Sequence, residues 1–382
     1  MLDNIEVLTG AAAVAEGEQT GNEGGFRAPA RGPQFAKRLI EAADIWGEAL
    51  HAGGLAGFKA RARLVEALAT PDFPYLLGGV IDRELLREYN QAPSVWSKFA
   101  MRTTLRDFRE KNLIDLLGGR GILDPVKPGE EYKARAATES KYAISVGKRG
   151  ARFALTWEML VNDDLDAFRT LPGRLSDASH VTEDYLATSQ LVTSTGANTA
   201  FFKAANGNAP TALALTTDNL AAAITAVQNR KDSDGNPIDL SAGVVLLVPP
   251  SLEMTAMQIV NAVEIRVTDG SNQLVTANYL KSKVTIVVDP WLTVIATDGK
   301  AATRWFLLPQ PTAPRPAIAV GFLRGHEVPD LRVKSDAGMR VGGGVIDPTE
   351  GSFDFDDLQY RVRHVIGAAT VDPKVTYCSD GS

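Results

Sequence analysis

The chain of 382 residues has few of the side chains that most often build cross-links and metal centres. It has a single cysteine, Cys378, so an internal disulfide framework is excluded. We interpret this thiol as incidental, in a protein kept in a reducing compartment. The four histidines, His51, His180, His326 and His364, are scattered with no ligand spacing between any pair. The sequence therefore predicts no metal site and no cofactor.

Sequence motifs of common catalytic sites are also missing. There is no G-x-S-x-G nucleophile elbow, no P-loop, no H-E-x-x-H, and no G-x-G-x-x-G after a predicted strand. The glycine run at 342–344 lacks the rest of a phosphate-binding signature, and we interpret it as a flexible loop. Helix capping and solvation explain the acidic clusters at 163–164 and 354–357 better than acid–base chemistry does. We therefore predict a protein that is not an enzyme.

Basic charge and long apolar runs are lacking as well. The formal net charge is −6, whereas a protein that grips nucleic acid as its main task carries a basic footprint. The first 25 residues hold five acids and no Lys or Arg, the reverse of a secretory signal peptide. No run approaches the roughly 18 apolar residues that a membrane helix needs. We expect a soluble intracellular protein with no membrane partner.

What the chain does have is apolar residues, 45% of the total, enough for a sizeable core spread over two or three lobes. The stretch from 151 to 192 organises these lobes. It begins as an alternating strand, passes through Asn162-Asp163-Asp164, which suit a helix N-cap, and continues with apolar residues at helical spacing. A helix from about 165 to 192 would be roughly 40 Å long. Pro172 lies inside it, so we expect a kink, or a short helix followed by a long one.

Residues 1–71 form a separate N-terminal segment. Residues 1–33 are rich in Gly, Ala and Glu, which indicates flexible or only locally ordered chain. Two short amphipathic helices follow, and they are either an appendage packed on the main body or a segment that acts in assembly. Residues 80–89 indicate a third helix and 101–108 a half-exposed strand, with Trp96 and Phe99 as anchors between them.

Residues 127–152 indicate a long two-stranded excursion, with alternation at 132–136 on the way out and at 142–146 on the way back. An isolated two-stranded ribbon is marginal in water, so a neighbour usually supports it, and here the neighbour can be another copy of the chain. A solvated hairpin is the alternative. The excursion holds three acids against seven basic residues, which are Lys127, Lys133, Arg135, Lys141, Lys148, Arg149 and Arg152.

Strands and helices alternate from about 200 to 325, which indicates an α/β lobe. Thr217 is expected to cap a helix, and Pro249 and Pro250 suit the first turn of another over 251–262. Residues 331–377 return to alternation and indicate antiparallel strands joined by a loop over 342–353. A continuous apolar run predicts a strand buried on both faces at 244–248, and residues 284–288 and 305–308 are expected to be a second and a third buried strand.

In this order the segments resemble the major capsid proteins of tailed bacteriophages, whose fold is shared with encapsulins. They look most like the branch whose members are sometimes fused to a prohead protease, although no protease domain is present here. The resemblance covers about residues 72–382. Besides the basic excursion and the long helix it rests on Phe73-Pro74-Tyr75-Leu76-Leu77-Gly78, Phe153-Ala154-Leu155-Thr156, Asn162-Asp163-Asp164-Leu165, Leu247-Val248-Pro249-Pro250, Val287-Val288-Asp289-Pro290 and Tyr360-Arg361-Val362-Arg363.

The resemblance implies an α+β fold of the tailed-phage major capsid type. Its parts would be a flexible and helical segment over 1–71, scaffold-like or an arm, and an N-terminal arm with the start of the peripheral domain over 72–112. They would continue with an extended two-stranded loop over 113–155, the peripheral domain with its long spine helix over 156–199, an α/β axial domain over 200–325, and the closing strands of the peripheral domain over 326–382.

The function that it implies is that of a major capsid protein, which assembles with itself into the hexamers and pentamers of an icosahedral virion shell in the host bacterial cytoplasm. Further partners would be portal, scaffold and cement proteins, and the shell would enclose double-stranded DNA without sequence-specific binding. Two alternatives stay open: an encapsulin-like shell of a cellular compartment, and an α/β enzyme with its site in the 200–325 lobe. The candidates for contacts between subunits are Lys133, Arg135, Lys141, Lys148, Arg149 and Trp96.

Some relatives in this family join their subunits through a Lys–Asn isopeptide bond. The last asparagine here is Asn278, so the C-terminal region that supplies the acceptor in those relatives has none. We expect a shell that is held together without covalent bonds between subunits.

Overall fold

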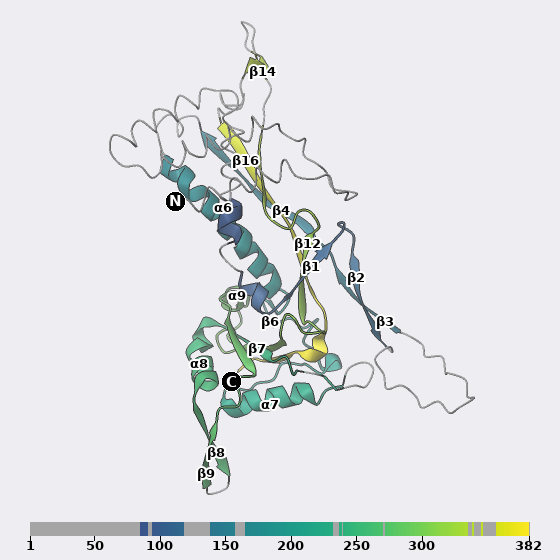
Figure 1. Ribbon diagram of the computed structural model, residues 1–382, viewed down its shortest axis with the longest axis vertical. Coiled ribbons are helices and arrows are strands. Elements are labelled where there is room, and N and C mark those ends of the chain that lie inside the picture. Colours follow the sequence, from purple (N-terminus) through teal and green to yellow (C-terminus); the bar gives the residue numbers. More distant parts are fainter. Residues whose placement is uncertain are drawn as a thin grey trace, which may run out of the picture. The chain divides into compact units, whose positions relative to one another are not determined.

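The structure is a computed structural model that describes residues 85–90, 94–117, 138–156, 165–231, 237–238, 240–269, 272–334, 338–339, 345–346 and 357–381. The chain divides into two compact units. Unit 1 comprises Met1–Ala92, Lys148–Ser179 and Val328–His364, and unit 2 comprises Pro93–Gly147, His180–Glu327 and Val365–Ser382. Helix α6 (Leu165–Thr188) and strand β16 (Asp357–Thr370) contribute residues to both units (Figure 1). Among the described helices, none combines the length and the apolar character needed to cross a membrane.

Unit 1 is built on the first half of β16. Strand β13 (Asp330–Val333) pairs with it antiparallel, and β4 (Gly147–Thr156) also pairs with β16. A small core joins Leu85, Leu175 of α6 and Val362 of β16. Beside it, Phe153 stacks on Tyr360 with the ring centroids 5.3 Å apart. A short hairpin pairs β14 (Gly338–Met339) with β15 (Val345–Ile346).

A four-stranded sheet carries the larger core of unit 2. Its order is β10-β7-β11-β17, with β7 parallel to β10 and antiparallel to β11. The strands are β7 (Val244–Val248), β10 (Val284–Val288), β11 (Trp305–Pro309) and β17 (Tyr377–Ser379). Every residue of β7 and β11 is buried, which confirms the two continuous apolar runs as strands covered on both faces.

Helices cover one face of this sheet, and a second sheet covers the other. On the first face, α7 (Thr217–Gln228) contributes Ile224 and α8 (Glu253–Asn261) contributes Val260 to a core with Trp305. On the second face, Leu186 of α6 and Phe322 of β12 (Ile318–Leu323) share a core with strands β7 and β11. The sheet is therefore the rigid centre of unit 2.

Strand β12 lies between β1 (Met101–Leu105), to which it is parallel, and the second half of β16, to which it is antiparallel. Strand β1 is half exposed, as its alternating residues predict. Two ribbons of two strands each complete the unit: β2 (Lys111–Leu117) with β3 (Thr138–Ile144), and β8 (Glu264–Asp269) with β9 (Asn272–Ala277). The short elements are η1 (Val95–Lys98), β5 (Val192–Thr193), β6 (Gly196–Ala197), η2 (Ala204–Asn206), η3 (Pro250–Leu252), α9 (Trp291–Ile295) and η5 (Pro373–Val375).

The long helix is a single element. Helix α6 runs through Pro172 from Leu165 to Thr188, so a short helix followed by a separate long one is wrong. A proline inside a helix costs about 3 kcal/mol, because it removes one hydrogen bond and crowds the preceding turn. Burial of Leu175, Ser176 and Ser179 on the following turns supplies packing that offsets this cost.

Three local expectations are corrected by the structure. The N-cap of α7 is Thr216, whose side chain accepts the Asn219 N–H, and not Thr217. Strand β10 is not buried on both faces, because it is the edge strand of its sheet and exposes Thr285. Pro249 is the N-cap of a 3-10 turn, η3, that begins at Pro250, and α8 itself begins at Glu253.

Two further differences concern strand pairing. The return strand β3 pairs with β2 at 111–117, whereas the outward strand expected at 132–136 lies outside the described residues. The last strand, β17, pairs with β11 in the four-stranded sheet, although the closing strands were expected to stay together. Arg304 secures this end because its Nε donates to Asp380 Oδ1 at 2.7 Å. The interpretations of 1–71, of the glycine run at 342–344 and of the acids at 163–164 lie outside the described residues.

Candidate assembly surfaces

The five basic residues predicted to contact other subunits fall into three groups. Lys133 and Arg135 lie outside the described residues. Lys141 lies on β3, paired with Ile114 of β2. Lys148 and Arg149 are exposed on β4, the position that a contact with another chain requires. Their role in such a contact stays a prediction.

Trp96 lies inside the core of its own chain. It is 5% exposed, and its ring centroid lies 5.8 Å from that of Phe322. The indole Nε1 donates to Glu183 Oε2 at 2.8 Å, and the backbone N–H donates to Asp184 Oδ1 at 2.8 Å. These bonds fasten η1 to the end of α6, so Trp96 acts as an anchor within the chain.

The end of α6 carries a buried carboxylate beside a histidine. Glu183 is 1% exposed and also accepts a hydrogen bond from Ser94 Oγ at 2.9 Å. His180 Nδ1 lies 2.8 Å from the same hydroxyl oxygen and 3.9 Å from Glu183 Oε2. The serine hydroxyl therefore bridges the two titratable side chains.

Two more carboxylates lie at this junction. The pKa of Asp184 is raised to about 6: burial raises it most, the hydrogen bond from the Trp96 N–H lowers it, and the charges of Asp289 and Glu183 add to the rise. Burial also raises the pKa of Asp289, against the hydrogen bonds that it accepts from the Thr188 hydroxyl and the Trp291 N–H. Both shifts favour the neutral carboxyl group. Within the described residues, no three His, Cys, Asp or Glu side chains are grouped to hold a metal ion.

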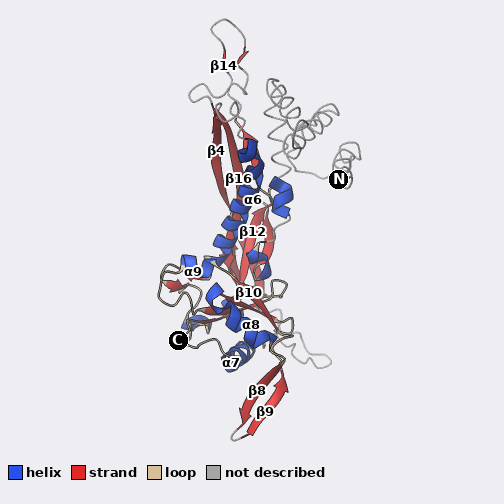
Figure 2. Cartoon of the chain, turned by 90° about the vertical axis from the view of Figure 1, so that its left-hand side faces the viewer, coloured by secondary structure: helices blue, strands red, loops and turns tan. Residues whose placement is uncertain are grey.

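Neither two-stranded ribbon of unit 2 pairs with a third strand within the described residues. Figures 1 and 2 show that β8–β9 projects from the rest of unit 2. A two-stranded ribbon is marginal in water unless another element supports it. Each ribbon is held by its own chain at one end, β2–β3 through the buried Ile144 and β8–β9 through its link to α8, so the remainder of each ribbon favours contact with a further chain.

Exposed apolar side chains lie on α8 and on the residues that flank β8–β9. Val263, just before β8, is 79% exposed, and Tyr279, just after β9, is 53% exposed. Met254 and Met257 lie three residues apart on α8, with 67% and 39% exposure. We call these four residues the apolar collar. Apolar groups that gather around a projecting element mark a protein contact more strongly than scattered ones do.

The collar stands on a fixed base. Asn278 Nδ2 donates to the carbonyl oxygens of Ile259 at 2.8 Å and Val260 at 3.0 Å, which ties the end of β9 to the end of α8. The Asn278 N–H donates to Val263 O at 3.1 Å. Because these bonds hold the hairpin against the helix, the collar is a preformed surface.

A second exposed apolar group lies on α6 and α9. Val181 and Tyr185 are four residues apart on α6 and are 46% and 43% exposed, and Val294 on α9 is 61% exposed. The Tyr185 ring contacts Trp291 edge to face, with the centroids 5.5 Å apart. A heterologous interface needs two different surfaces on each subunit, and unit 2 carries two such groups.

Cys378 lies on β17, where it is fully buried, and burial raises the pKa of its thiol. A buried, protonated thiol is a poor partner for a disulfide with another chain. Its position fits the interpretation of the thiol as incidental.

The hairpin β8–β9 was not predicted, although the sequence carries a signal for it. Residues 264–268 alternate between polar and apolar, residues 275–276 are the β-branched pair Val-Thr, and Asp269-Gly270 is a dipeptide favoured in hairpin turns. The exposure of Met254 and Met257 had no such signal, because a nine-residue helix with apolar residues on several sides does not specify which side is covered.

Projecting ribbons and a preformed apolar surface are features of a protein that assembles with further chains. Residues 139–378 match the family model described as phage capsid protein, and since this is more than half of the sequence, the chain belongs to the phage capsid protein family. Its α+β fold is that of the phage major capsid proteins, as the resemblance implied. No curated protein matches the sequence.

Solved capsids resemble the structure at low identity. The capsid of a native GTA particle is 13% identical with a TM-score of 0.46, over 75% of this chain and 90% of the other. The capsid of Gordonia phage Cozz is 14% identical with a TM-score of 0.44, over 76% and 86%. A virus-like particle from Pyrococcus furiosus is 12% identical with a TM-score of 0.38, over 78% and 97%. These likenesses concern the fold alone.

Proposed function

We propose that the chain is the major capsid subunit of a tailed phage, and that its copies form the hexamers and pentamers of an icosahedral shell around double-stranded DNA. The observation that carries this proposal is the apolar collar at the base of β8–β9, together with membership of the phage capsid protein family. Repeated heterologous contacts close into rings, and rings joined to each other close into a shell.

The collar and the second apolar group suit the contacts within a ring. In this proposal the collar of one subunit packs against the group formed by Val181, Tyr185 and Val294 of the next. Residues 200–325 then act as the axial domain, and β8–β9, which its own chain holds only at the base, gains further support from its neighbours.

The ribbon β2–β3 and strand β4 suit contacts of another kind. Residues 113–155 act as the extended loop that lies over a neighbouring subunit, where Lys133, Arg135, Lys141, Lys148 and Arg149 meet acidic groups. Exposed ion pairs contribute only about 0–1 kcal/mol each, but the shell repeats them at every contact.

The role proposed is structural and not catalytic. The remaining partners are a portal, a scaffold and cement proteins, the DNA is enclosed without sequence-specific binding, and assembly takes place in the host bacterial cytoplasm without a membrane. An encapsulin-like compartment is the second candidate, since encapsulins share this fold. The contents of purified particles separate the two, because a phage head holds DNA and an encapsulin holds an enzyme.

The collar gives a direct test of assembly. The double variant Met254→Gln, Met257→Gln should keep the thermal stability of the unassembled protein, because both side chains are exposed. It should raise the protein concentration at which shells form by roughly tenfold, which corresponds to about 1.4 kcal/mol per contact.

The matched control is Leu213→Gln, since Leu213 is 40% exposed and lies outside the collar, while Met257 is 39% exposed. Shell formation is followed by light scattering and electron microscopy. If the double variant and the control assembled at the same protein concentration, the collar would not be part of the contact between subunits.

A further inference from the structure

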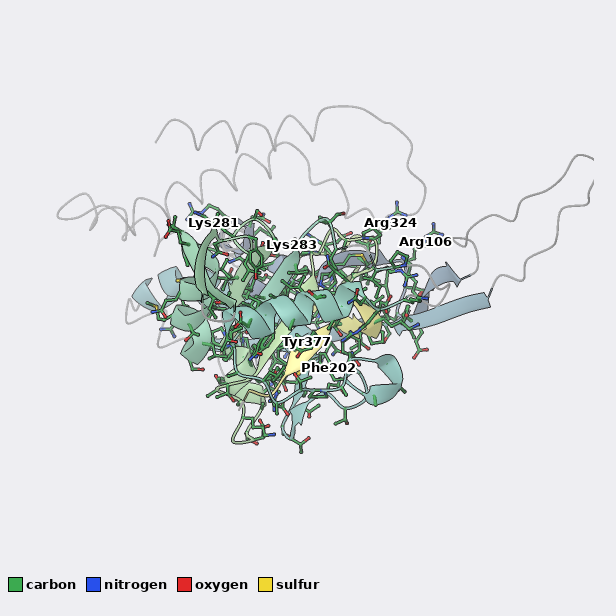
Figure 3. The ribbon with its side chains drawn as sticks, turned by 90° about the horizontal axis from the view of Figure 1, so that it is seen from below. Arg106, Phe202, Lys281, Lys283, Arg324 and Tyr377 are labelled. Carbon is green, nitrogen blue, oxygen red and sulfur yellow. The ribbon has the colours of Figure 1, made fainter. Side chains whose placement is uncertain are left out.

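One side of unit 2 gathers four basic side chains. Figure 3 shows Arg106, Arg324, Lys281 and Lys283 along the same side of the unit. Arg106, Arg324 and Lys281 are exposed and Lys283 is half-buried. None of the four forms an ion pair with another residue that the structure describes. We call these four residues the basic face.

Two of the four charges are held next to each other by the sheet. Strands β1 and β12 are parallel, with Leu105 opposite Leu323, and the following residues are Arg106 and Arg324. The backbone N–H of Arg324 donates to Leu105 O at 2.8 Å, which continues the pairing past the strand ends. The side chains of Arg106 and Arg324 therefore start from adjacent backbone positions at the ends of two paired strands.

Carboxylates in the same two turns do not neutralise these arginines. Asp107 Oδ1 accepts the backbone N–H of Arg109 at 3.1 Å, and Glu327 Oε1 accepts the backbone N–H of Gly325 at 3.0 Å. Like charges at neighbouring strand positions repel each other. A bound anion would relieve this repulsion, so the pair favours an anionic ligand.

The two lysines also stand on a fixed support. The Lys283 N–H donates to Leu280 O at 3.0 Å, and Lys283 O accepts the Val244 N–H at 2.8 Å, at the start of β7 and β10. Lys281 belongs to the same turn. The basic face thus consists of two pairs of cations, each mounted at the end of a pair of parallel strands.

We infer that the basic face lines the inside of the shell and contacts the phosphate backbone of the enclosed double-stranded DNA. This inference rests on the proposed function. Separate cations on rigid supports suit a ligand whose negative charges repeat along its length. A protein partner would need an apolar anchor at its centre. Among the large exposed apolar residues of unit 2, only Phe108 and Tyr279 lie within two residues in sequence of the basic face, and the others lie on separate segments.

The small number of cations fits a container that must release its contents. Four phosphate contacts per subunit, against a net chain charge of −6, give weak and salt-sensitive attraction. Such attraction orders DNA along the wall without trapping it.

The test measures binding of a 30-base-pair duplex (roughly 100 Å long at 3.4 Å per base pair) to unassembled full-length protein by fluorescence anisotropy over a salt series. Two double variants are compared with wild type: Arg106→Gln, Arg324→Gln, and Lys281→Gln, Lys283→Gln. The control is Lys203→Gln, Lys231→Gln, which removes the same charge from exposed positions elsewhere in unit 2.

Each test variant should lower the slope of log K against log salt by about 1.8, because duplex DNA contributes about 0.9 per phosphate contact. Its binding should therefore change roughly tenfold less than that of wild type between about 50 and 200 mM salt. The control should keep the wild-type slope. Equal slopes for all variants would overturn the inference. It would also be overturned if the test variants kept their binding to DNA and lost only their binding to an acidic polypeptide.

Binding of added duplex DNA to closed shells tests whether the basic face lies on the inside of the shell. Closed, empty shells of wild type should bind added duplex no better than shells of the test variants do, because the basic face would be enclosed. Shells that bind external duplex through these residues would overturn the orientation. Electron microscopy reports shell formation separately, so a failure to assemble counts against the proposed function and not against DNA binding by the unassembled protein.

Discussion

Replacing Gly367 with alanine should destabilise unit 2, because β16 passes the backbone of the β3–β4 link there with no room for a methyl group. A Cβ at Gly367 would overlap the carbonyl oxygen of Ser145, and it would lie 2.9 Å from the carbonyl carbon of Ser145 and 3.1 Å from Val146 Cα. Optimal separation between carbon atoms is about 3.5–4.0 Å. The link, which leads out of the β2–β3 ribbon, would have to move.

The expected cost follows from what has to move. Overpacking costs about 1–3 kcal/mol, and a backbone clash that no rotamer can relieve belongs at the upper end. The loss of glycine from the unfolded chain returns about 0.4–1 kcal/mol. We expect a net loss of about 2 kcal/mol, which lowers the unfolding midpoint by about 4–8 °C for a unit of roughly 200 residues.

Two glycines provide graded controls for calorimetry of the unassembled protein. A Cβ at Gly321, which pairs with Gly367, would meet Leu105 Cδ1 at 2.6 Å and Ile144 Cδ1 at 3.0 Å, the ends of flexible side chains. A Cβ at Gly147 would meet no atom within 4 Å. The midpoint should fall most for Gly367→Ala, less for Gly321→Ala and least for Gly147→Ala. A Gly367→Ala protein as stable as Gly147→Ala would refute the close crossing of β16 and the link.

Three other outcomes follow from the structure. Asp184 has a pKa of about 6 in the folded protein and 3.8 in the unfolded chain, so unit 2 should lose stability as the pH rises from about 4 to 6. The variant Asp184→Asn should remove this pH dependence of the free energy of unfolding, measured by chemical denaturation over that window. A pH dependence that the substitution leaves unchanged would exclude Asp184 as its source. Reversing Lys148 and Arg149 to glutamate should leave the monomer folded and impair shell formation, and normal shells from that variant would contradict a subunit contact there. Boiling mature particles in detergent with reductant should give one band near 40.9 kDa, since Cys378 is buried and no asparagine follows Asn278, whereas a ladder of multimers would reveal a covalent bond.

Local patterns predicted the elements whose burial is determined by their own sequence. The run at 244–248 became β7 with all five residues buried, and the alternation at 101–108 became β1, a half-exposed strand that ends at Leu105. A similar run at 284–288 gave a strand with an exposed Thr285, because its place at the sheet edge depends on chain far away in sequence. Pairing across long separations, such as β17 with β11, leaves no trace in either segment alone.

The candidate surfaces divide in the same way. A sequence shows that Lys148 and Arg149 are charged and therefore belong at the surface, where they lie. It does not show that Trp96 finds its partner in Glu183, 87 residues away, and so is an internal anchor. Nor does it show that Arg106 and Arg324 occupy neighbouring positions, since that follows from the parallel pairing of β1 with β12.

Electron microscopy of the purified protein, with sedimentation over a range of protein and salt concentrations, tests the capsid role most directly. The apolar collar and the two-stranded ribbons, which pair with no third strand among the described residues, predict rings of subunits and closed shells, in equilibrium with smaller species at low concentration. A compact monomer at every concentration and salt would contradict the proposal that this chain builds a shell.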